Sequence, residues 1–334
     1  MHKMHSKEFE EKLSNFELQL SKRFKKEFEV TTSIFRSVSR VVDENMNLIK
    51  PKTDFEWAVT FLFYRAYKLY WTILILSQKG FGPEAAILAR SLMEHAVNMQ
   101  WIAKDDHDNR AKLFLEYFHV ARKKLYDNYD KYGVFPNLTD IEKQSMESRE
   151  EIEKRYEEVK QNYPEEWYWA PIKIRTRAYD VGAEYDWDFY YWGFSFLAHP
   201  NASSQFDFLI PNQLENTFII GPSYSKIQDV LVLGCKYLLL ALNSWNFVFG
   251  LELENLIVAG YVSQEFRFLS NQTILRKQLA VNAGGGFLTF APFVIKVALR
   301  FHIRKKRKAP RLPRVGAAGF YKVGLKDAVL RIRS

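Results

Sequence analysis

Apolar side chains recur at every third or fourth position along much of this chain, which is the spacing of amphipathic α-helices. The clearest series lies in residues 6–29 and consists of Phe9, Leu13, Phe16, Leu20, Phe24 and Phe28. We expect residues 6–29 and 31–49 to form an amphipathic helical pair that ends near Pro51. Its apolar stripe either packs on its own domain or offers a coiled-coil surface to a partner.

Helical periodicity continues to about residue 251. Further helices are predicted over residues 55–78 (capped by Asp54), 82–106, from an aspartate near position 106 to Tyr132, and over 139–161, 186–198 and 223–251. Residues 163–185 lose the period and should form a loop with a short helix, while residues 206–222 alternate weakly, as in a short hairpin. Arg65 and Lys68 interrupt the apolar run of 55–78, which argues against a membrane span. The pattern predicts an all-α fold, a multi-helix bundle.

The segment 139–161 is the most charged of these predicted helices. A capping box at Thr139 and Glu142 starts it, and its thin apolar stripe consists of Ile141, Ile152 and Val159. We expect a solvated helix on the surface of the bundle.

The helix predicted over 82–106 carries the sharpest chemical feature of the sequence. One of its faces is small and apolar, with Ala85, Ala89, Leu92, Ala96, Met99 and Ala103. On the flank of this face, Arg90 and Glu94 lie within ~40° of each other, whereas His95 lies ~140° from Arg90. The three residues predict half of a polar site. The simpler alternative is an ion pair that orients the helix, beside a surface histidine.

A second candidate lies in residues 190–200, at the end of another predicted helix. Ser195 and His199 are four residues apart and are therefore neighbours on one helix face. A nucleophilic Ser–His pair would also need an orienting group and an oxyanion hole, and we identify neither in the sequence. The alternative is that both side chains hydrogen-bond to the backbone, or to each other, and terminate the helix.

Three segments resemble a bacterial family of uncharacterised helical proteins: residues 88–94 (LARSLME), 174–178 (IRTRA) and 191–200, which runs from Tyr191 through Ser-x3-His-Pro. The resemblance covers about residues 55–250. It implies that Arg90, Glu94, Ser195 and His199 converge in one polar pocket, to which residues 190–200 contribute the second half. It implies no activity.

The spacing Arg90-x4-His95 also resembles the Arg-x(4–6)-His pattern of HEPN-type helical ribonucleases. That resemblance implies that the arginine positions phosphate and the histidine assists attack by the ribose 2′-hydroxyl, usually across a dimer interface. The chemistry is reasonable, because guanidinium binds phosphate bidentately and histidine exchanges protons near neutral pH. His95 is not part of the pattern of the uncharacterised family, which counts against this function.

The composition limits which disulfides and metal sites the chain can form. A single cysteine, Cys235, excludes an intramolecular disulfide and a multi-cysteine zinc site, and its leucine-rich surroundings predict core packing. Glu116-x-x-His119 has the spacing of a di-iron ligand pair, but the sequence contains no second Glu-x-x-His. No metal and no cofactor is predicted.

The net charge of +9 belongs to the last part of the sequence. Residues 301–334 hold 11 of the 48 Lys and Arg and one of the 39 Asp and Glu, so residues 1–300 carry a net charge of −1. Residues 279–295 are uncharged and precede a basic stretch at 296–314. This region predicts a disordered tail, a tail anchor, or a segment that binds an anionic membrane surface. The charged residues 1–16 lack a signal peptide, so we expect a cytoplasmic protein, peripheral or tail-anchored at the membrane if this region binds lipid.

These observations divide the chain into an N-terminal amphipathic segment (1–50), a helical core domain (51–255) and an apolar, then basic, tail (256–334). One of the three functions left open is that of a membrane-surface protein held by residues 279–308. The two others use the polar site. One is a HEPN-like, metal-independent endoribonuclease of a toxin or phage-defence system, active as a homodimer, with RNA as its partner. In it, Arg90 would bind phosphate, Glu94 would orient Arg90, and His95 or His199 would transfer protons. The other is a non-enzymatic module whose polar pocket binds a small ligand or a partner. RNA or another phosphate-bearing ligand is the partner expected for the site.

Overall fold

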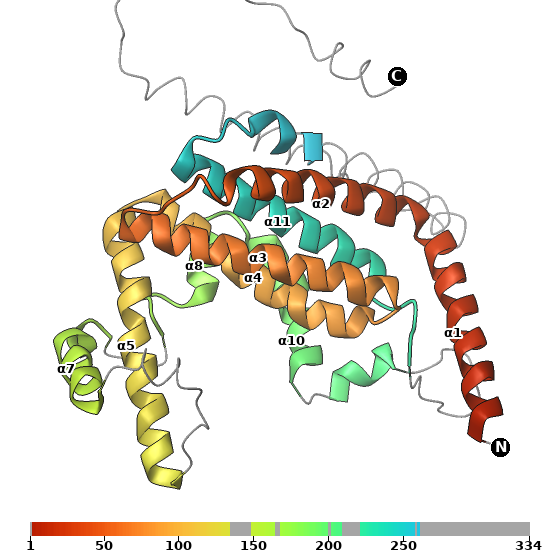
Figure 1. Ribbon diagram of the computed structural model, residues 1–334, viewed down its shortest axis with the longest axis horizontal. Helices are drawn as coiled ribbons and strands as arrows, with labels where there is room; N and C mark the ends of the chain where they lie inside the picture. Colours follow the sequence, from red (N-terminus) through yellow and green to blue (C-terminus); the bar gives the residue numbers. More distant parts are fainter. Residues whose placement is uncertain are drawn as a thin grey trace, which may run out of the picture. The chain divides into compact units, whose positions relative to one another are not determined.

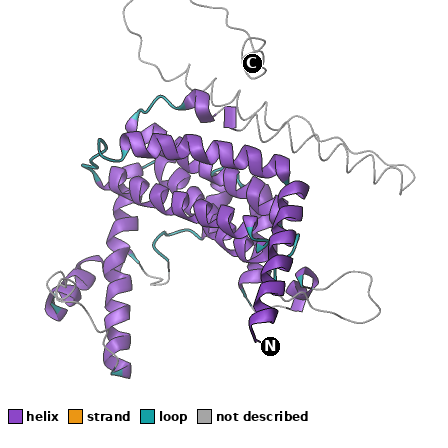
Figure 2. Ribbon diagram, turned by 45° about the vertical axis from the view of Figure 1, so that its right-hand side comes forward, coloured by secondary structure: helices purple, strands orange, loops and turns teal. Residues whose placement is uncertain are grey.

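The computed structural model describes residues 2–133, 148–163, 168–199, 202–208, 221–257 and 259–260, which belong to the compact unit of residues 1–272. The regular structure in these ranges is helical, and they contain no strand (Figure 2). The predicted all-α fold is confirmed. Three of the predictions lie outside these ranges: the Thr139–Glu142 capping box, most of the 206–222 hairpin, and the stretches at 279–295 and 296–314.

Four long helices form the bundle: α2 (Lys25–Asn45), α3 (Asp54–Gln78), α4 (Gly82–Lys104) and α11 (Ile227–Phe249). They lie side by side, with α11 packed against the other three (Figure 1). Phe63 of α3 stacks on Trp245 of α11 with ring centroids 4.4 Å apart, and both side chains are fully buried. Burial of large apolar side chains at ~25 cal/mol per Å² is the main stabilising contribution of this core.

Helix α3 begins with a capping box. The Thr53 hydroxyl accepts a hydrogen bond from the Glu56 N–H at 3.2 Å, and the Glu56 carboxylate accepts one from the Thr53 N–H at 3.4 Å. The prediction that Asp54 caps this helix is wrong, because Asp54 is its first residue. The spacing Thr-x-x-Glu satisfies two backbone donors, whereas a single aspartate satisfies one.

Helix α4 presents its small residues to the core, as predicted. Ala85, Ala89, Leu92, Ala96 and Met99 are fully buried. Gly82 makes close approach possible at the N-terminus of the helix, since a Cβ atom there would lie 2.0 Å from the Ser225 carbonyl oxygen, just before α11. The small face therefore lets α4 contact α3 and α11 closely along its length.

Two elements flank the bundle within this unit. Helix α1 (His2–Arg23) meets α2 at Phe24, where φ is −109° and ψ is 27°, so the break lies about six residues before the predicted one. Helix α5 (His107–Tyr132) ends at Gly133 in the left-handed region, and α7 (Arg149–Val159) packs against it (Figure 1). The predicted apolar stripe of this charged segment is confirmed at Ile152 and Val159, which are buried.

The chain between α7 and α11 is made of short elements: η1 (Lys160–Asn162), α8 (Ile174–Asp180), α9 (Glu184–Asp186), the π-helical turn η2 (Trp187–Tyr191), α10 (Trp192–Ala198) and the 3₁₀-helix η3 (Ala202–Asp207). The helix predicted over 186–198 is thus interrupted by a wide turn. A π-helical turn of this kind frequently marks a functional site.

Helix α11 is the one helix in the described part that is long and apolar enough to cross a membrane by length and composition. However, 72% of its most apolar window is buried inside the fold. Cys235 lies within it and is fully buried, which confirms core packing. The burial is that of a core helix.

Candidate functional site

Arg90 and Glu94 project from one flank of α4 and form an ion pair, with Arg90 Nη2 3.4 Å from Glu94 Oε1. A third residue joins them. The Tyr191 hydroxyl accepts a hydrogen bond from Arg90 Nη2 at 2.8 Å and donates one to Glu94 Oε1 at 2.6 Å. The guanidinium also lies over the Tyr191 ring, 4.6 Å from its centroid. Tyr191 therefore bridges the two charges and ties η2 to α4.

Tyr191 is held in place from two sides. Trp187, at the other end of the π-helical turn, stacks on it with ring centroids 3.5 Å apart. The residue before this turn, Asp186, is buried and accepts hydrogen bonds from Lys236 and Tyr237 of α11, the latter at 2.9 Å. The wide turn is thus anchored to α11 at one end and to α4 at the other.

Arg177 of α8 reaches the same flank of α4 one turn further along. It is only 3% exposed, and its Nη1 donates to the Asn98 side-chain oxygen at 2.6 Å. Its guanidinium lies over the Trp169 ring at 4.6 Å. Its Nε is buried without a hydrogen-bond partner, and so is that of Arg90. We call Arg90, Glu94, Asn98, Arg177 and Tyr191 the α4 polar cluster.

Burial shapes the electrostatics of the α4 polar cluster. It lowers the pKa of Arg177 to about 10, although the Glu94 charge acts in the opposite direction. Burial, followed by the Glu94 hydrogen bond and charge, raises the pKa of Tyr191 to about 12, while Arg90 opposes this. Arg177 is thus cationic and Tyr191 is neutral near pH 7. The cluster contains two guanidinium groups and one carboxylate.

His95 lies on a different flank of α4, as its ~140° offset from Arg90 predicts. Its Nδ1 is 2.7 Å from the Ser91 carbonyl oxygen, and since a carbonyl only accepts, Nδ1 carries the proton and Nε2 is the acceptor in the neutral ring. Burial and the positive charge of Arg65 lower the pKa of His95, while the Ser91 carbonyl and Glu94 raise it. The alternative of a surface-exposed histidine is wrong, because His95 is half-buried.

Ser195 lies on α10 and His199 directly follows this helix, both after Tyr191 in sequence. The Ser195 hydroxyl donates to the Tyr191 carbonyl at 2.7 Å, within its own helix. His199 follows the last residue of α10, its side chain is exposed, and its backbone N–H donates to the Ser195 carbonyl at 3.1 Å. Within the ranges that the structure describes, no hydrogen bond or ion pair joins the His199 imidazole to Arg90, Glu94 or Ser195. The structure places Tyr191, instead, between Arg90 and Glu94.

The comparison with known families bears on this arrangement. Residues 56–216 match the model of a family of unknown function, DUF5677. The resemblance to an uncharacterised family is confirmed, whereas the match gives no support to the resemblance to HEPN-type ribonucleases. No curated protein and no solved structure matches the chain. All five residues of the α4 polar cluster lie within the DUF5677 segment.

Arg90 and Glu94 of the α4 polar cluster were predicted from the sequence, whereas Arg177, Tyr191 and Asn98 were not. Arg177 and Tyr191 could have been chosen as site residues, because they belong to the segments 174–178 and 191–200. The resemblance to the uncharacterised family rests on these segments. Asn98 is four residues after Glu94 and continues the same flank of the helix. Arg177 is a cation in a short, irregular region, and its burial depends on Trp169 and α4, which no periodicity predicts.

The metal pattern considered in the sequence has a simpler local explanation. Glu116 is 3.7 Å from Lys112 in an ion pair within α5. Among the described residues, no group of three His, Cys, Asp or Glu side chains comes close enough to hold a metal ion.

Proposed function

We propose that this chain is a non-enzymatic helical module that binds a phosphate-bearing ligand through the α4 polar cluster. One observation carries the proposal: two guanidinium groups share the cluster with one carboxylate, and that carboxylate is already engaged by Arg90 and Tyr191. A buried or half-buried cation without its own counter-ion is costly. A bound phosphate would supply the missing negative charge.

Accessibility and donor geometry support a ligand at this position. The Arg90 side chain is 23% exposed and that of Glu94 is 35% exposed, so the cluster reaches the surface. Arg177 is buried behind it, and the positive charge of a planar guanidinium suits bidentate contact with phosphate oxygens. The aromatic rings of Tyr191 and Trp169 hold the two guanidinium groups in fixed orientations.

The positions of the other candidate residues support a binding role over a catalytic one. Proton transfer requires an acid or base within hydrogen-bond reach of the reacting group. His95 lies on another flank of α4, and the Ser195 hydroxyl is engaged by its own helix backbone. Arg90, Glu94 and Tyr191 can bind and orient an anion, but with a Tyr191 pKa near 12 the phenol is a poor proton donor at neutral pH.

The test is a thermal-shift titration of the full chain with uridine 5′-monophosphate, and with uridine as the ligand that lacks the phosphate. We expect the nucleotide to raise the melting temperature and uridine to leave it unchanged, since ligands that bind the folded state stabilise it. Arg90→Gln should remove the shift. Arg175→Gln is the matched control: Arg175 lies on the same helix as Arg177 but is exposed and pairs with Asp188 at 3.2 Å. Equal shifts for nucleotide and nucleoside would refute the proposal.

A metal-independent endoribonuclease, acting as a homodimer in toxin or phage defence, is the second candidate. The observation in its favour is His95, whose lowered pKa and free Nε2 suit a general base, with the cation of Arg65 nearby. A single chain does not bring His95 to Arg90, so a phosphate would have to contact both across two subunits. Purified chain that cleaves total RNA, and loses this activity in both His95→Ala and Arg90→Ala, would support it. RNA left intact by the wild-type chain would exclude it.

A further inference from the structure

The outer side of α3 is an exposed stripe that is apolar at both ends and cationic in the middle. The residues that face outward are Trp57, Phe61, Arg65, Lys68, Trp71 and Ile75, and each of them is exposed. They follow one another at the helical spacing of three or four, so they form a continuous line about 27 Å long. The inner side of α3 packs on α4 and α11. We call this line the α3 stripe.

Four large apolar side chains of the α3 stripe are about half exposed: Trp57 at 55%, Phe61 at 51%, Trp71 at 52% and Ile75 at 49%. At roughly 200 Å² for each side chain, they leave about 400 Å² of apolar surface in contact with water. Exposed patches of this size on a single chain are often functional. Trp71 contacts Phe35 of α2, with ring centroids 6.0 Å apart, yet about half of its side chain is left exposed. An exposed apolar patch of this kind calls for a partner.

The charge of the stripe defines that partner. From residue 57 to residue 78, Arg65 and Lys68 are the only charged residues of α3, and no carboxylate occurs in this range. Among the described residues no ion pair neutralises either of them. His95, which faces Arg65, stays largely neutral because its pKa is lowered. The α3 stripe, with its apolar ends and cationic middle, therefore complements a partner surface with apolar ends and an acidic middle.

A second copy of this chain does not fit that description. Arg65 and Lys68 lie at the middle of the line, so a two-fold axis through its centre would place cations opposite cations. Like charges directly opposed disfavour such an interface. The observations therefore disfavour an isologous dimer along α3.

Single-stranded nucleic acid also fits less well. A strand carries about one phosphate per 3.4 Å, so a length of ~27 Å would hold about eight, against two cations in the stripe. Trp57, Phe61 and Trp71 could each stack on a base, so it is the shortage of cations that disfavours nucleic acid. An amphipathic helix, in contrast, needs one or two acidic residues in its middle turns to match the stripe.

We propose that the α3 stripe is a docking site for an acidic amphipathic helix of a partner protein. The partner helix lies along α3, its apolar residues cover Trp57, Phe61, Trp71 and Ile75, and its central carboxylates pair with Arg65 and Lys68. This is the helix-in-groove mode of recognition, with anchors at every third or fourth position. Apolar contact gives most of the affinity, and the charges select the partner and its register. The proposal does not depend on the α4 polar cluster.

The test uses the full chain and two designed fluorescent peptides of about 20 residues, the length that spans the stripe. Both peptides carry leucines along one helical face. One has two glutamates in its middle turns, and the other has two lysines there. We expect fluorescence anisotropy to show saturable binding of the glutamate peptide, at least about tenfold tighter than that of the lysine peptide.

A charge-swapped variant makes the test decisive. Arg65→Glu/Lys68→Glu should reverse the preference between the peptides, and Trp57→Ala/Trp71→Ala should weaken both. Because all four side chains are exposed, circular dichroism and melting temperature should match wild type, and they serve as the folding control. Lys79→Glu, also on the surface, is the matched charge control and should leave the preference unchanged.

Three results would overturn the proposal. The first is equal binding of both peptides, or a preference that the charge swap leaves in place. The second is a wild-type dimer in light scattering that becomes monomeric in Arg65→Glu/Lys68→Glu, which would assign the stripe to a second copy. The third is tight binding of a uridine 20-mer that is lost in the same variant, which would assign the stripe to nucleic acid.

Discussion

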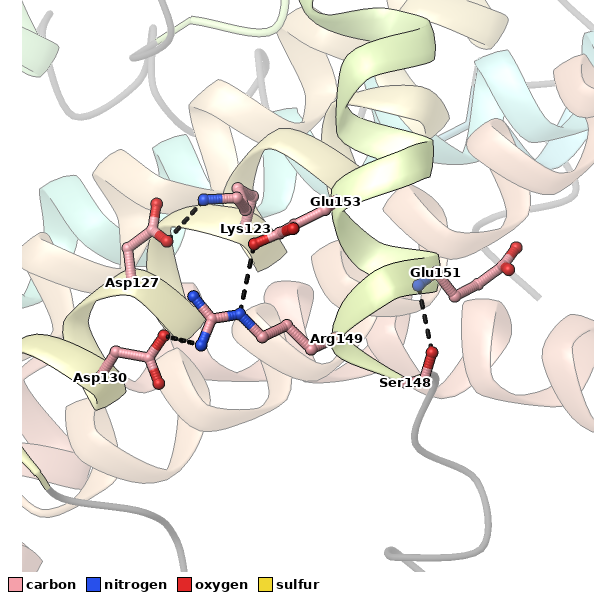
Figure 3. A network of polar contacts seen from close by, with 7 residues as sticks. All are labelled: Lys123, Asp127, Asp130, Ser148, Arg149, Glu151 and Glu153. Atoms are coloured by element: carbon pink, nitrogen blue, oxygen red, sulfur yellow. Dashed lines mark hydrogen bonds and ion pairs between the residues drawn. The ribbon is translucent and has the colours of Figure 1, made fainter.

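Two of the networks of charged side chains that join helices in the described part of the chain differ in burial. The α4 polar cluster connects α4, α8 and η2 around a guanidinium that is 3% exposed. The second network connects α5 to α7, where Arg149 contacts Asp130 at 2.7 Å and Glu153 at 3.2 Å, beside a Lys123–Asp127 pair at 2.6 Å (Figure 3). In the second network every charge has a close counter-charge and water surrounds the arginine.

The number of ion pairs in a network is therefore a poor guide to what the network contributes to stability or function. The α5–α7 network has more of them, but exposed pairs contribute little because water already solvates each partner. The α4 polar cluster holds two guanidinium groups and one carboxylate, so it has an excess of positive charge. Its surroundings are more buried, and there both hydrogen bonds and charges have larger energetic effects than at the surface. Function is expected where burial and charge imbalance coincide.

The largest effect expected is that of Arg177→Ala. It removes a side chain packed against Trp169 and leaves the Asn98 oxygen without its donor, so we expect a loss of about 2–4 kcal/mol in the free energy of unfolding. Urea denaturation measures it, with Arg175→Ala on the same helix as the exposed control. Equal losses of stability in both variants would mean that burial does not distinguish the two arginines. That result would contradict the larger energetic role given to the α4 polar cluster.

A second variant of the same residue separates stability from binding. Arg177→Met keeps most of the packed stem and relieves the cost of burying a charge, so its stability should stay within about 1 kcal/mol of wild type. Its response to uridine 5′-monophosphate should nevertheless be lost. A stable Arg177→Met protein that still binds the nucleotide would limit Arg177 to a structural role.

Tyr191→Phe should have an intermediate effect. It removes only the hydroxyl that bridges Arg90 and Glu94, and since both charges are partly solvated, we expect about 1 kcal/mol of lost stability. Tyr179→Phe is the matched control, because the Tyr179 hydroxyl also bonds to a carboxylate, Asp188, but is exposed. Equal melting temperatures for the two variants would contradict the bridging role.

His95 should give the protein a weak pH dependence. Its pKa is lowered in the folded state, so between that value and the unfolded value of ~6.5 the unfolded chain binds more protons. Stability contributed by His95 is therefore complete above ~6.5 and is lost as the pH falls through the folded-state pKa. The loss of melting temperature between pH 7 and pH 5 should be smaller in His95→Gln than in wild type. An NMR titration of His95 that gives a pKa above 6.5 would contradict the prediction.

The smallest effect is expected in the α5–α7 network. Arg149→Ala removes contacts to Asp130 and Glu153 between side chains that water reaches, so the melting temperature should not change measurably. Added salt should leave this result as it is. A clear drop in melting temperature would mean that the exposed network carries more weight than its burial suggests.

The sequence predicts the helices of this fold well because their apolar residues repeat over many turns. Helix α3 was expected over residues 55–78 and spans Asp54–Gln78, and the small face of α4 is buried as predicted. Where the apolar pattern is short or the backbone is irregular, the sequence no longer predicts the secondary structure. The π-helical turn η2 lies inside a segment predicted to be one regular helix, because no periodicity signals a single wide turn.

The site was only half predictable for the same reason. Arg90 and Glu94 are four residues apart on one helix, so their contact follows from helical geometry. Arg177 and Tyr191 come to them from α8 and η2, 79 and 97 residues away from their respective partners Asn98 and Glu94. Such contacts depend on how short elements pack on α4. The resemblance to the uncharacterised family implied His199 as a partner, whereas the structure places Tyr191 between Arg90 and Glu94.

The most direct test of the proposed ligand site is an NMR spectrum of the arginine side-chain Nε–Hε groups. Uridine 5′-monophosphate should shift the signals of Arg90 and Arg177, whose Nε atoms are buried without partners, and leave that of Arg175 in place. Uridine should shift none of them. Unchanged Arg90 and Arg177 signals at saturating nucleotide, or the same shifts with uridine, would contradict phosphate binding at the α4 polar cluster.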